Sequence, residues 1–320
     1  MSSYLTFRIL KGLFVVVLIS LMTFVIMRLM PGDPVYLLLG EGQIPITDAQ
    51  IEAIRAKWGL DRPYHEQFLV WAGNLLRGDF GTSLIRTGVP VRQMIFEAIP
   101  ITALLNLYAL ALAIAVAVPI GIAAAARKNS WLDYTTNAFS ALGIATPNFW
   151  LALMLIVLFA LYVPRWFGDL PLIGRIPPFG LRSWQGWILP VIVLATEEMA
   201  VLMRITRGTV LELLPQEFVR TARSKGLAER VVLYRHVVSN ALLPIVTVIG
   251  FRIAFILSGT IIVENVFAIP GIGRLFVDSV LRLDYQVVQS LVVIFAVLVV
   301  VVNLLTDLIY ALVDPRIRIS

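Results

Sequence analysis

Long apolar stretches free of charged residues occur in four places along the chain. They cover residues 12–27, 98–126, 134–164 and 285–306. A helix needs about 20 apolar residues to cross a hydrocarbon core about 30 Å thick, and these stretches match or approach that length. Two further candidates, residues 187–203 and 241–263, are interrupted by charged residues. The pattern therefore predicts an all-α polytopic membrane protein with six transmembrane helices.

The composition agrees with this pattern. Of the 320 residues, 59% are hydrophobic and 14% are charged, and the mean hydropathy is +0.88. These values exclude a soluble globular protein. Arg8 and Lys11 precede the first apolar stretch, which continues to Met30 without a small-residue cleavage site. We therefore expect a retained membrane anchor there and not a signal peptide.

The distribution of lysine and arginine predicts the orientation of the chain. Six spans place both termini on one side, and basic residues crowd into the short segments of that side. These residues are Arg8, Lys11, Arg127, Lys128, Arg204, Arg207, Arg220, Arg223, Lys225, Arg230, Arg235, Arg316 and Arg318. Since short cytoplasmic segments are enriched in basic residues, both termini are expected to be cytoplasmic. The net charge of +6 follows from this topology and gives no reason to expect nucleic-acid binding.

The segment after the first span is too long for a simple connection. Residues 47–59 and 63–76 each predict an amphipathic helix, with Gly59 just past the end of the first. Two interpretations stay open: the helices only cover the bundle, or they meet a delivered ligand or an external partner. The expected organisation is a first transmembrane helix at 1–30, an extracytoplasmic helical loop at 31–99, a five-helix transmembrane core at 100–313 with a cytoplasmic segment at 205–243, and a cytoplasmic tail at 314–320.

A compact charged segment, Glu217 to Gly226, lies between two apolar stretches. Glu217 suits the first turn of a helix, and Gly226 suits a left-handed helix end. The apolar positions are Phe218, Val219 and Ala222, and the basic positions are Arg220, Arg223 and Lys225. A helix of this kind is suited to dock a soluble partner. The alternative is an ordinary solvated loop that is basic because it lies inside the cell.

Catalytic chemistry has little support in the sequence. There is no cysteine, so thiolate catalysis, disulfides and sulfur metal ligands are excluded. His65 and His236 fall on opposite predicted sides of the membrane, so they cannot share a metal site or a catalytic triad. No lysine follows a glycine, so the phosphate-binding G-x-x-x-x-G-K-[ST] loop is missing. We expect no catalytic, metal or cofactor site in this chain, and any nucleotide-driven work needs another subunit.

Charged residues inside predicted spans are candidates for a translocation path, because a charge in the bilayer requires a polar partner or water. They are Glu197, Glu198 and Arg252. Pairing of Arg252 with one glutamate is one possibility, and an ordinary interhelical ion pair is the structural alternative. Adjacent glutamates on a helix point about 100° apart, so at most one is expected to face directly down a central path.

Other polar residues and prolines in the apolar stretches suggest helix contacts and bends. Asn106, Asn148 and Asn303 are expected to hydrogen-bond between helices more often than to bind a ligand. Pro119 and Pro147 are expected to kink or break their helices. No internal repeat is visible in the sequence, which weakens a secondary-transporter model built on inverted repeats.

At this level of detail the sequence resembles the inner-membrane permease subunits of ATP-binding-cassette importers for dipeptides and oligopeptides. The similar blocks, in order, are residues 28–34 (RLMPGDP), 58–63 (WGLDRP), 78–83 (GDFGTS), 145–150 (ATPNFW), 220–226 (RTARSKG), 235–236 (RH), 240–244 (NALLP) and 263–273 (VENVFAIPGIG). The long loop after the first span is similar to that of the first of the two permeases in such importers.

The resemblance implies a coupling helix that docks an ATPase. Its residues here are Glu217, Arg220, Thr221, Ala222, Arg223, Lys225 and Gly226. The general family pattern E-A-A-x-x-x-G is altered, because Arg220-Thr221-Ala222 stands where E-A-A would. The small Ala222 and the helix-ending Gly226 remain, and they suit close packing and a sharp helix end.

The resemblance also implies partners and a location. The partners are a second permease subunit, one or two ATP-binding subunits that carry ATP and Mg²⁺, an extracytoplasmic substrate-binding protein and membrane lipid. The candidate contacts with the binding protein are Trp58, Asp61 and Asp79. The location is a bacterial inner membrane, and the implied function is import of short peptides. The alternatives are import of nickel chelates or glutathione, an ion-coupled secondary transporter that uses Glu197, Glu198 and Arg252, and a membrane scaffold.

Overall fold

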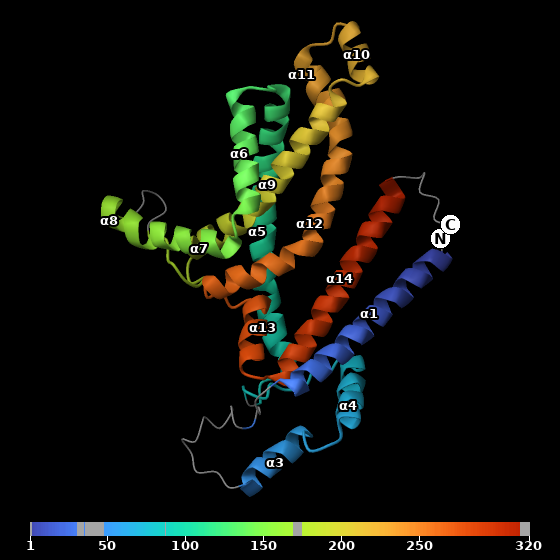
Figure 1. Cartoon of the computed structure of the whole chain (residues 1–320), viewed down its shortest axis with the longest axis vertical. Helices are drawn as coiled ribbons and strands as arrows, with labels where there is room; N and C mark the ends of the chain where they lie inside the picture. Colours follow the sequence, from blue (N-terminus) through green and yellow to red (C-terminus); the bar gives the residue numbers. More distant parts are fainter. Residues whose placement is uncertain (1, 31–34, 36–47, 87, 169–174, 314–320) are drawn as a thin grey trace. The chain divides into compact units, whose positions relative to one another are not determined.

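The computed structural model describes residues 2–30, 35, 48–86, 88–168 and 175–313, and nearly all of its regular structure is helical (Figure 1). Its helices fall into two compact units, which are described separately below. The first unit contains the described residues up to Ile101 together with Pro270–Leu305, and the second contains Thr102–Ile269 and the end of the last helix. The predicted all-α membrane class is confirmed.

Among the described residues, five helical segments are long and apolar enough to cross a membrane. They are Thr6–Leu29, Val91–Ala126, Asn148–Phe167, Glu229–Gly250 and Tyr285–Leu304. The helix α9 (Ile188–Leu213) is also long, but its interior carries Glu197, Glu198, Arg204 and Arg207. Within the described residues it does not join the other five. The sixth span therefore stays a prediction.

The first unit combines the N-terminal helix and most of the last helix with the helices of the predicted outer loop. It contains α1 (Ser2–Leu29), α3 (Asp48–Trp58), α4 (Tyr64–Leu76), the start of α5 (Val91–Ala126), α13 (Ile272–Leu281) and most of α14 (Tyr285–Val313). The two predicted loop helices are confirmed as α3 and α4. Gly59 follows α3 with φ +65°, as expected for a left-handed helix end. The predicted cap Thr47 lies outside the described residues.

Aromatic and aliphatic side chains join α4 to α1 and α14 in this unit. Trp71 of α4 is 7% exposed and belongs to one buried cluster with Phe24 and Val293. The Phe24 and Phe68 rings meet edge to face with centroids 5.3 Å apart. The predicted loop helix α4 is thus part of a packed core and not a loose cover.

The second unit is a bundle in which α9 packs against both α6 and α12. Its further elements are α6 (Trp131–Ala145), α7 (Asn148–Ile156), the π-helix Val157–Tyr162, α8 (Val163–Phe167), α10 (Glu217–Ser224), α11 (Glu229–Val231), the π-helix Val232–Val238 and α12 (Ser239–Val266). Figure 1 shows α10 and α11 at the same end of the unit as the turn between α5 and α6.

The expected single span over residues 134–164 is wrong. The structure divides it at Thr146 and Pro147, where α6 ends in extended backbone and Pro147 caps α7. The reason is the proline, which disfavours helical geometry at the residue before it. The predicted break at Pro147 is confirmed. In contrast, α5 continues as one helix through Pro119.

Small residues bring the helices of the second unit close together. A β-carbon on Gly121 of α5 would lie 2.8 Å from the Thr206 β-carbon of α9, and one on Gly143 of α6 would lie 2.8 Å from the Ala200 β-carbon. Both distances are too short for a real contact, so glycine permits these approaches. The position of α9, and with it Glu197 and Glu198, depends on this packing.

Candidate translocation and docking sites

The charged residues predicted inside the spans lie together in the second unit. The Arg252 guanidinium donates from Nε to Glu198 Oε2 over 2.7 Å and from Nη2 to Glu198 Oε1 over 2.8 Å. The same Nη2 donates to Glu197 Oε1 over 3.1 Å. Both glutamates of α9 therefore share one arginine of α12, because the planar fork presents several donors at once.

The two glutamates differ in their exposure to solvent or lipid. The Glu198 side chain is 7% exposed and the Glu197 side chain is 39% exposed. Glu197 Oε2 also accepts a hydrogen bond of 2.9 Å from Asn148 Nδ2 at the start of α7. Three helices thus meet at one group of two acids and one base. This geometry fits a structural ion pair and a path contact alike, so the path role remains a prediction.

A second buried polar group, which the sequence did not single out as a site, connects α5 and α12. Thr102 Oγ1 donates to Glu264 Oε1 over 2.5 Å, and Thr260 Oγ1 donates to Asn106 Oδ1 over 2.7 Å. Glu264 is fully buried. The predicted interhelical role of Asn106 is confirmed, as is that of Asn148, whereas Asn303 lies exposed on α14. The only signal for Glu264 in the sequence was an acid within the block 263–273.

A third polar group, which the sequence analysis also did not single out, is an ion pair that connects α6 and α9. Asp133 is 2% exposed and accepts two hydrogen bonds from Arg207 and one from the backbone nitrogen of Asn129. The hydrogen bonds from Arg207 hold the pKa of the Asp133 carboxyl below its usual range, although burial acts in the opposite direction. Asp133 therefore stays ionised at neutral pH and fixes the start of α6 against α9.

The predicted helix Glu217–Gly226 is confirmed as α10, followed by Gly226 with φ +75°. Two salt bridges lie on its exposed surface. Arg220 pairs with Glu217 over 2.8 Å, and Arg223 donates to both oxygens of Glu229 at the start of α11. Exposed pairs of this kind contribute little stability, so their charges remain available to a partner.

The apolar face of α10 is turned toward its own unit. Val219 and Ala222 are buried in one cluster with Val210, Val237 and Ala241. We expected Phe218, Val219 and Ala222 to form one apolar stripe, but this prediction is wrong for Phe218, which is exposed. Its position in the helix turns it away from the face that Val219 and Ala222 share. Ala222 consequently holds α10 in place and is not itself accessible to an ATPase.

The accessible surface around α10 mixes basic and apolar side chains. Arg220, Thr221, Arg223 and Lys225 are exposed on α10 and at its end. Large apolar side chains are exposed beside them at Phe218, Leu227, Val231 and Tyr234. Aromatic anchors together with arginine are typical of the strongest contacts in protein interfaces. We call the four apolar residues and their basic neighbours the docking surface.

Replacing Gly226 with leucine should weaken coupling at this surface. A residue with a β-carbon loses about 1–2 kcal/mol in left-handed geometry, and a β-carbon at Gly226 would meet no other atom of the chain within 4 Å. The loss should come from backbone strain at the end of α10. We expect slower substrate-stimulated ATP hydrolysis by the assembled complex, with normal membrane insertion.

The variant Gly226→Asn is the matched control, because asparagine tolerates left-handed geometry. It should retain most of the activity. Wild-type turnover in the leucine variant would remove Gly226 from the coupling machinery, and an equal loss in both variants would show that the backbone conformation is not the cause.

The three residues predicted to contact a binding protein differ in their surroundings. Asp61 is exposed between α3 and α4. Asp79 is exposed too, and its carboxylate accepts a hydrogen bond of 2.9 Å from the backbone nitrogen of Gly81. Trp58 packs against a buried cluster that contains Met27, Leu84 and Tyr285. Trp58 therefore has a structural role, and Asp79 holds the backbone at Gly81. Of the three residues, Asp61 is the one for which no such contact is seen among the described residues.

Replacing Asp61 with lysine should slow association with the binding protein several-fold at low ionic strength, because charges at an interface rim act on the association rate. Surface plasmon resonance on the reconstituted complex would measure this rate. At 1 M salt the screening length is about 3 Å, and the difference from the wild type should disappear. Equal rates at low salt would place Asp61 outside the contact.

No group of three or more His, Asp or Glu residues suited to hold a metal ion occurs among the described residues. His65 lies in the first unit and His236 in the second. Several of the ion pairs described above, among them Asp133 with Arg207 and Arg252 with Glu198, connect helices. Their chemistry is suited to hold a bundle together and to line a polar path.

Two family models match the chain over almost its entire length. Residues 117–319 match the family described as "Binding-protein-dependent transport system inner membrane component". Residues 1–106 match the N-terminal family of the membrane components of binding-protein-dependent transport systems. The boundary between the two matches falls within α5.

Individual proteins agree with the family models. The chain is 41% identical to the oligopeptide transport system permease protein AppB of Bacillus subtilis (strain 168), over 99% of this chain and 100% of that protein. It is 38% identical to a putative peptide transport system permease protein of Brucella abortus (strain 2308), over 99% of both chains. It is 35% identical to the glutathione transport system permease protein GsiC of Escherichia coli, also over 99% of both.

A solved structure shows the same fold. The inward-facing MetNI methionine ABC transporter includes a chain that superposes with a TM-score of 0.57 at 15% identity. The similarity covers 70% of this chain and 97% of that chain. At this identity the likeness describes the fold alone.

Proposed function

The chain belongs to the family of inner membrane components of binding-protein-dependent transport systems, and we propose that it is one of two permease subunits of an ATP-driven importer for short peptides. It is a multi-pass membrane protein of the permease type. The observation that carries the peptide assignment is the similarity to peptide permeases, which extends over 99% of the chain at up to 41% identity.

The docking surface supports the proposed partnership with an ATPase. It combines exposed arginines with exposed aromatic and aliphatic side chains at one end of the second unit. The basic turn between α5 and α6, with Arg127 and Lys128, lies at the same end. This arrangement favours a cytoplasmic position for that end, with both termini also cytoplasmic. ATP and Mg²⁺ would bind to the partner subunits.

The shared ion pair of Arg252 with Glu197 and Glu198 supports a role at the translocation path. A short peptide carries a positive and a negative end, and a partly exposed group with both charges suits such a cargo. Glu197 is the accessible member, whereas Glu198 is held by two hydrogen bonds from Arg252. The predicted outer contact with a binding protein would deliver the peptide to this path.

Glutathione is the second candidate substrate, because a glutathione permease is similar over 99% of the chain. Uptake of a radiolabelled tripeptide by the complete complex in proteoliposomes tests the assignment. An excess of unlabelled oligopeptide should abolish the signal, and an excess of glutathione should leave it nearly unchanged. Efficient competition by glutathione together with none by oligopeptides would overturn the peptide assignment.

A further inference from the structure

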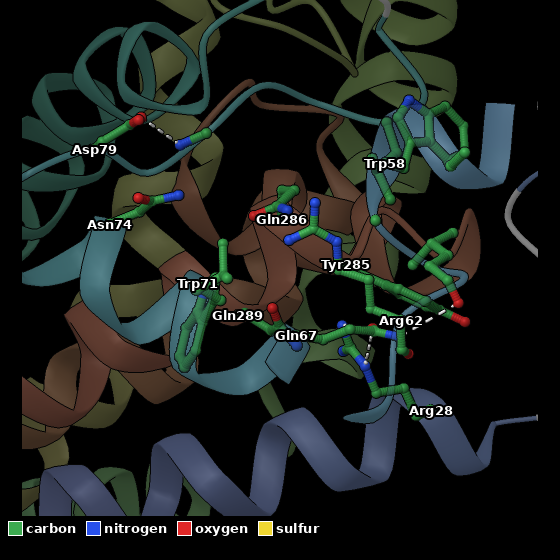
Figure 2. A pocket seen from close by; sticks show the side chains of 16 residues that line it. Arg28, Trp58, Arg62, Gln67, Trp71, Asn74, Asp79, Tyr285, Gln286 and Gln289 are labelled. Atoms are coloured by element: carbon green, nitrogen blue, oxygen red, sulfur yellow. Dashed lines mark hydrogen bonds between the residues drawn. The ribbon is translucent and has the colours of Figure 1, made fainter. Parts of the chain in front are cut away.

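A cavity of about 240 Å³ lies within the first unit, among α1, α4, the segment after α3 and the start of α14 (Figure 2). It contains polar side chains from three helices, namely Arg28 of α1, Gln67 and Trp71 of α4, and Gln289 of α14. No role at the docking surface or the translocation path uses these residues. The cavity is smaller than the roughly 300–1,000 Å³ typical of sites for drug-sized ligands.

Among the residues that the structure describes, three buried hydrogen-bond donors around this cavity have no acceptor. They are Arg28 Nη1, Trp71 Nε1 and Gln289 Nε2. Trp71 is 7% exposed and Gln289 is 1% exposed, so bulk solvent cannot satisfy them freely. Arginine and tryptophan side chains can only donate hydrogen bonds. Leaving such groups unpaired is unfavourable, so three of them around one cavity indicate that an acceptor occupies it.

Gln67 holds the arginine in place for such an acceptor. Its Oε1 accepts hydrogen bonds from Arg28 Nε over 3.1 Å and from Arg28 Nη2 over 2.9 Å. Its Nε2 donates to the backbone oxygens of Leu60 and Arg62. The Gln67 amide is therefore fully engaged, and the Arg28 fork is fixed with Nη1 left over. The guanidinium also lies 3.6 Å from the centroid of the Phe24 ring.

The charge of the cavity is positive. Arg28 and Arg62 line it together with one acid, Asp79, whose carboxylate accepts a hydrogen bond from Gly81. Among the residues that the structure describes, Arg28 forms no salt bridge with a carboxylate. A buried guanidinium is usually paired with an anion. The missing partner is therefore expected to be negatively charged.

Part of the remaining wall is apolar, although Asn74 and Gln286 also line the cavity. Leu60, Val70 and Leu84 line the cavity beside the donors. Such a wall suits a short aliphatic group attached to the charged end. A carboxylate accepts up to four hydrogen bonds, so its oxygens can accept from Arg28 Nη1 and from the two other donors.

We propose that this cavity binds a small carboxylate with a short apolar side chain, such as a free amino acid or the last residue of a short peptide. Arg28 and Trp71 donate to its carboxylate, with Gln289 as a third donor, and the aliphatic wall receives its side chain. The peptide as the source of the carboxylate rests on the proposed function, whereas the site itself does not. It is separate from the Arg252 group, which belongs to the second unit.

Fluorine NMR of the complete complex in neutral-lipid nanodiscs tests this site without nucleotide or binding protein. All tryptophans are replaced by 5-fluorotryptophan, and the Trp71 signal is assigned with Trp71→Phe. Titration with dialanine should shift the Trp71 signal, whereas dialanine amide, which lacks the carboxylate, should not. The signal of Trp184, which is exposed in the second unit, is the control and should not move.

Three variants test whether Arg28 and Gln289 bind the ligand that shifts the Trp71 signal. Arg28→Met and Gln289→Met should each weaken binding of dialanine about tenfold, because each removes a hydrogen bond to a charged group. Gln289→Glu should abolish binding by placing a second negative charge beside the carboxylate. An unchanged Trp184 signal and normal assembly with the other subunits show that each variant is folded.

The outcomes separate this site from its alternatives. An equal shift with free alanine and with dialanine supports a carboxylate site for any small acid. Equal shifts with acid and amide, undiminished binding in all three variants, or no shift of Trp71 would each overturn the proposal. A shift caused by phosphatidylglycerol in the nanodisc but not by dialanine would assign the donors to a lipid phosphate and overturn it as well. Peptide uptake is not measured here, so failure of this site leaves the proposed transport function standing.

Discussion

Replacing Arg252 with leucine should reduce peptide uptake at least about tenfold. The change removes the only described partner that donates to both Glu198 oxygens and leaves a carboxylate of 7% exposure without a counter-charge. Removing one member of a buried pair is unfavourable by about 3–5 kcal/mol. We expect a lower melting temperature of the purified complex together with the loss of uptake in proteoliposomes.

A second substitution separates the structural role of Arg252 from a role on the path. Adding Glu198→Gln removes the uncompensated charge, so the double variant should regain most of the lost thermal stability. Recovery of uptake as well would show an ordinary structural ion pair. Recovery of stability without uptake would show that Arg252 acts on the cargo. Glu197→Gln is the milder comparison because Glu197 is 39% exposed and has a second partner in Asn148.

Wild-type stability and uptake in Arg252→Leu would contradict the pairing seen in the structure. Wild-type uptake in the single neutral variants of all three residues would place the translocation path elsewhere in the bundle.

Truncating the aromatic anchors of the docking surface should uncouple the permease from its ATPase. Phe218 is 39% exposed and Tyr234 is 60% exposed. The Phe218→Ala and Tyr234→Ala variants should each weaken binding of the ATPase subunit about 30-fold, because truncation of an interface hot spot loses about 2 kcal/mol or more. The affinity can be measured with the purified ATPase and the permease pair in nanodiscs.

Trp131→Ala is the matched control for this measurement. Trp131 is 78% exposed at the start of α6, at the same end of the second unit but outside the docking surface. The control should bind the ATPase with wild-type affinity. Unchanged affinity in both anchor variants would refute the docking surface, and an equal loss in the control would show a general effect of removing aromatic side chains.

The local features of the docking segment were predictable because they depend on neighbouring residues. The helix from Glu217 and its left-handed end at Gly226 follow from end preferences that act within a few positions. The orientation of that helix was predicted less well. Phe218 and Val219 are adjacent and both apolar, and only contact with residues such as Val237 decides that Val219 is buried and Phe218 exposed.

Most of the polar contacts between helices could not be predicted from the sequence. Asp133 and Arg207 are 74 positions apart, and Thr102 and Glu264 are 162 positions apart. No spacing rule pairs residues at such separations, because the pairing depends on which helices pack together. Arg252 was found in advance only because a charge inside an apolar stretch is conspicuous by itself.

The helix break at Pro147 was predicted correctly, but the predicted extent of the span around it was wrong. The proline was expected to bend or break its helix, yet the uncharged stretch 134–164 suggested one continuous span. The structure gives a short α6 of 15 residues and a separate α7. Hydropathy reports the environment of a segment, whereas the backbone at a proline decides whether one helix continues through it.

We expect this chain to transport peptides only when a partner subunit hydrolyses ATP. Uptake of a labelled tripeptide should be measured in proteoliposomes that contain both permeases and the binding protein, with and without the ATPase subunits. We expect the tripeptide to accumulate in an ATP-dependent way in the complete system. Without the ATPase subunits it should not accumulate, whatever ion gradient is applied. Accumulation driven by a proton or sodium gradient in the absence of the ATPases would contradict this expectation and favour an ion-coupled transporter.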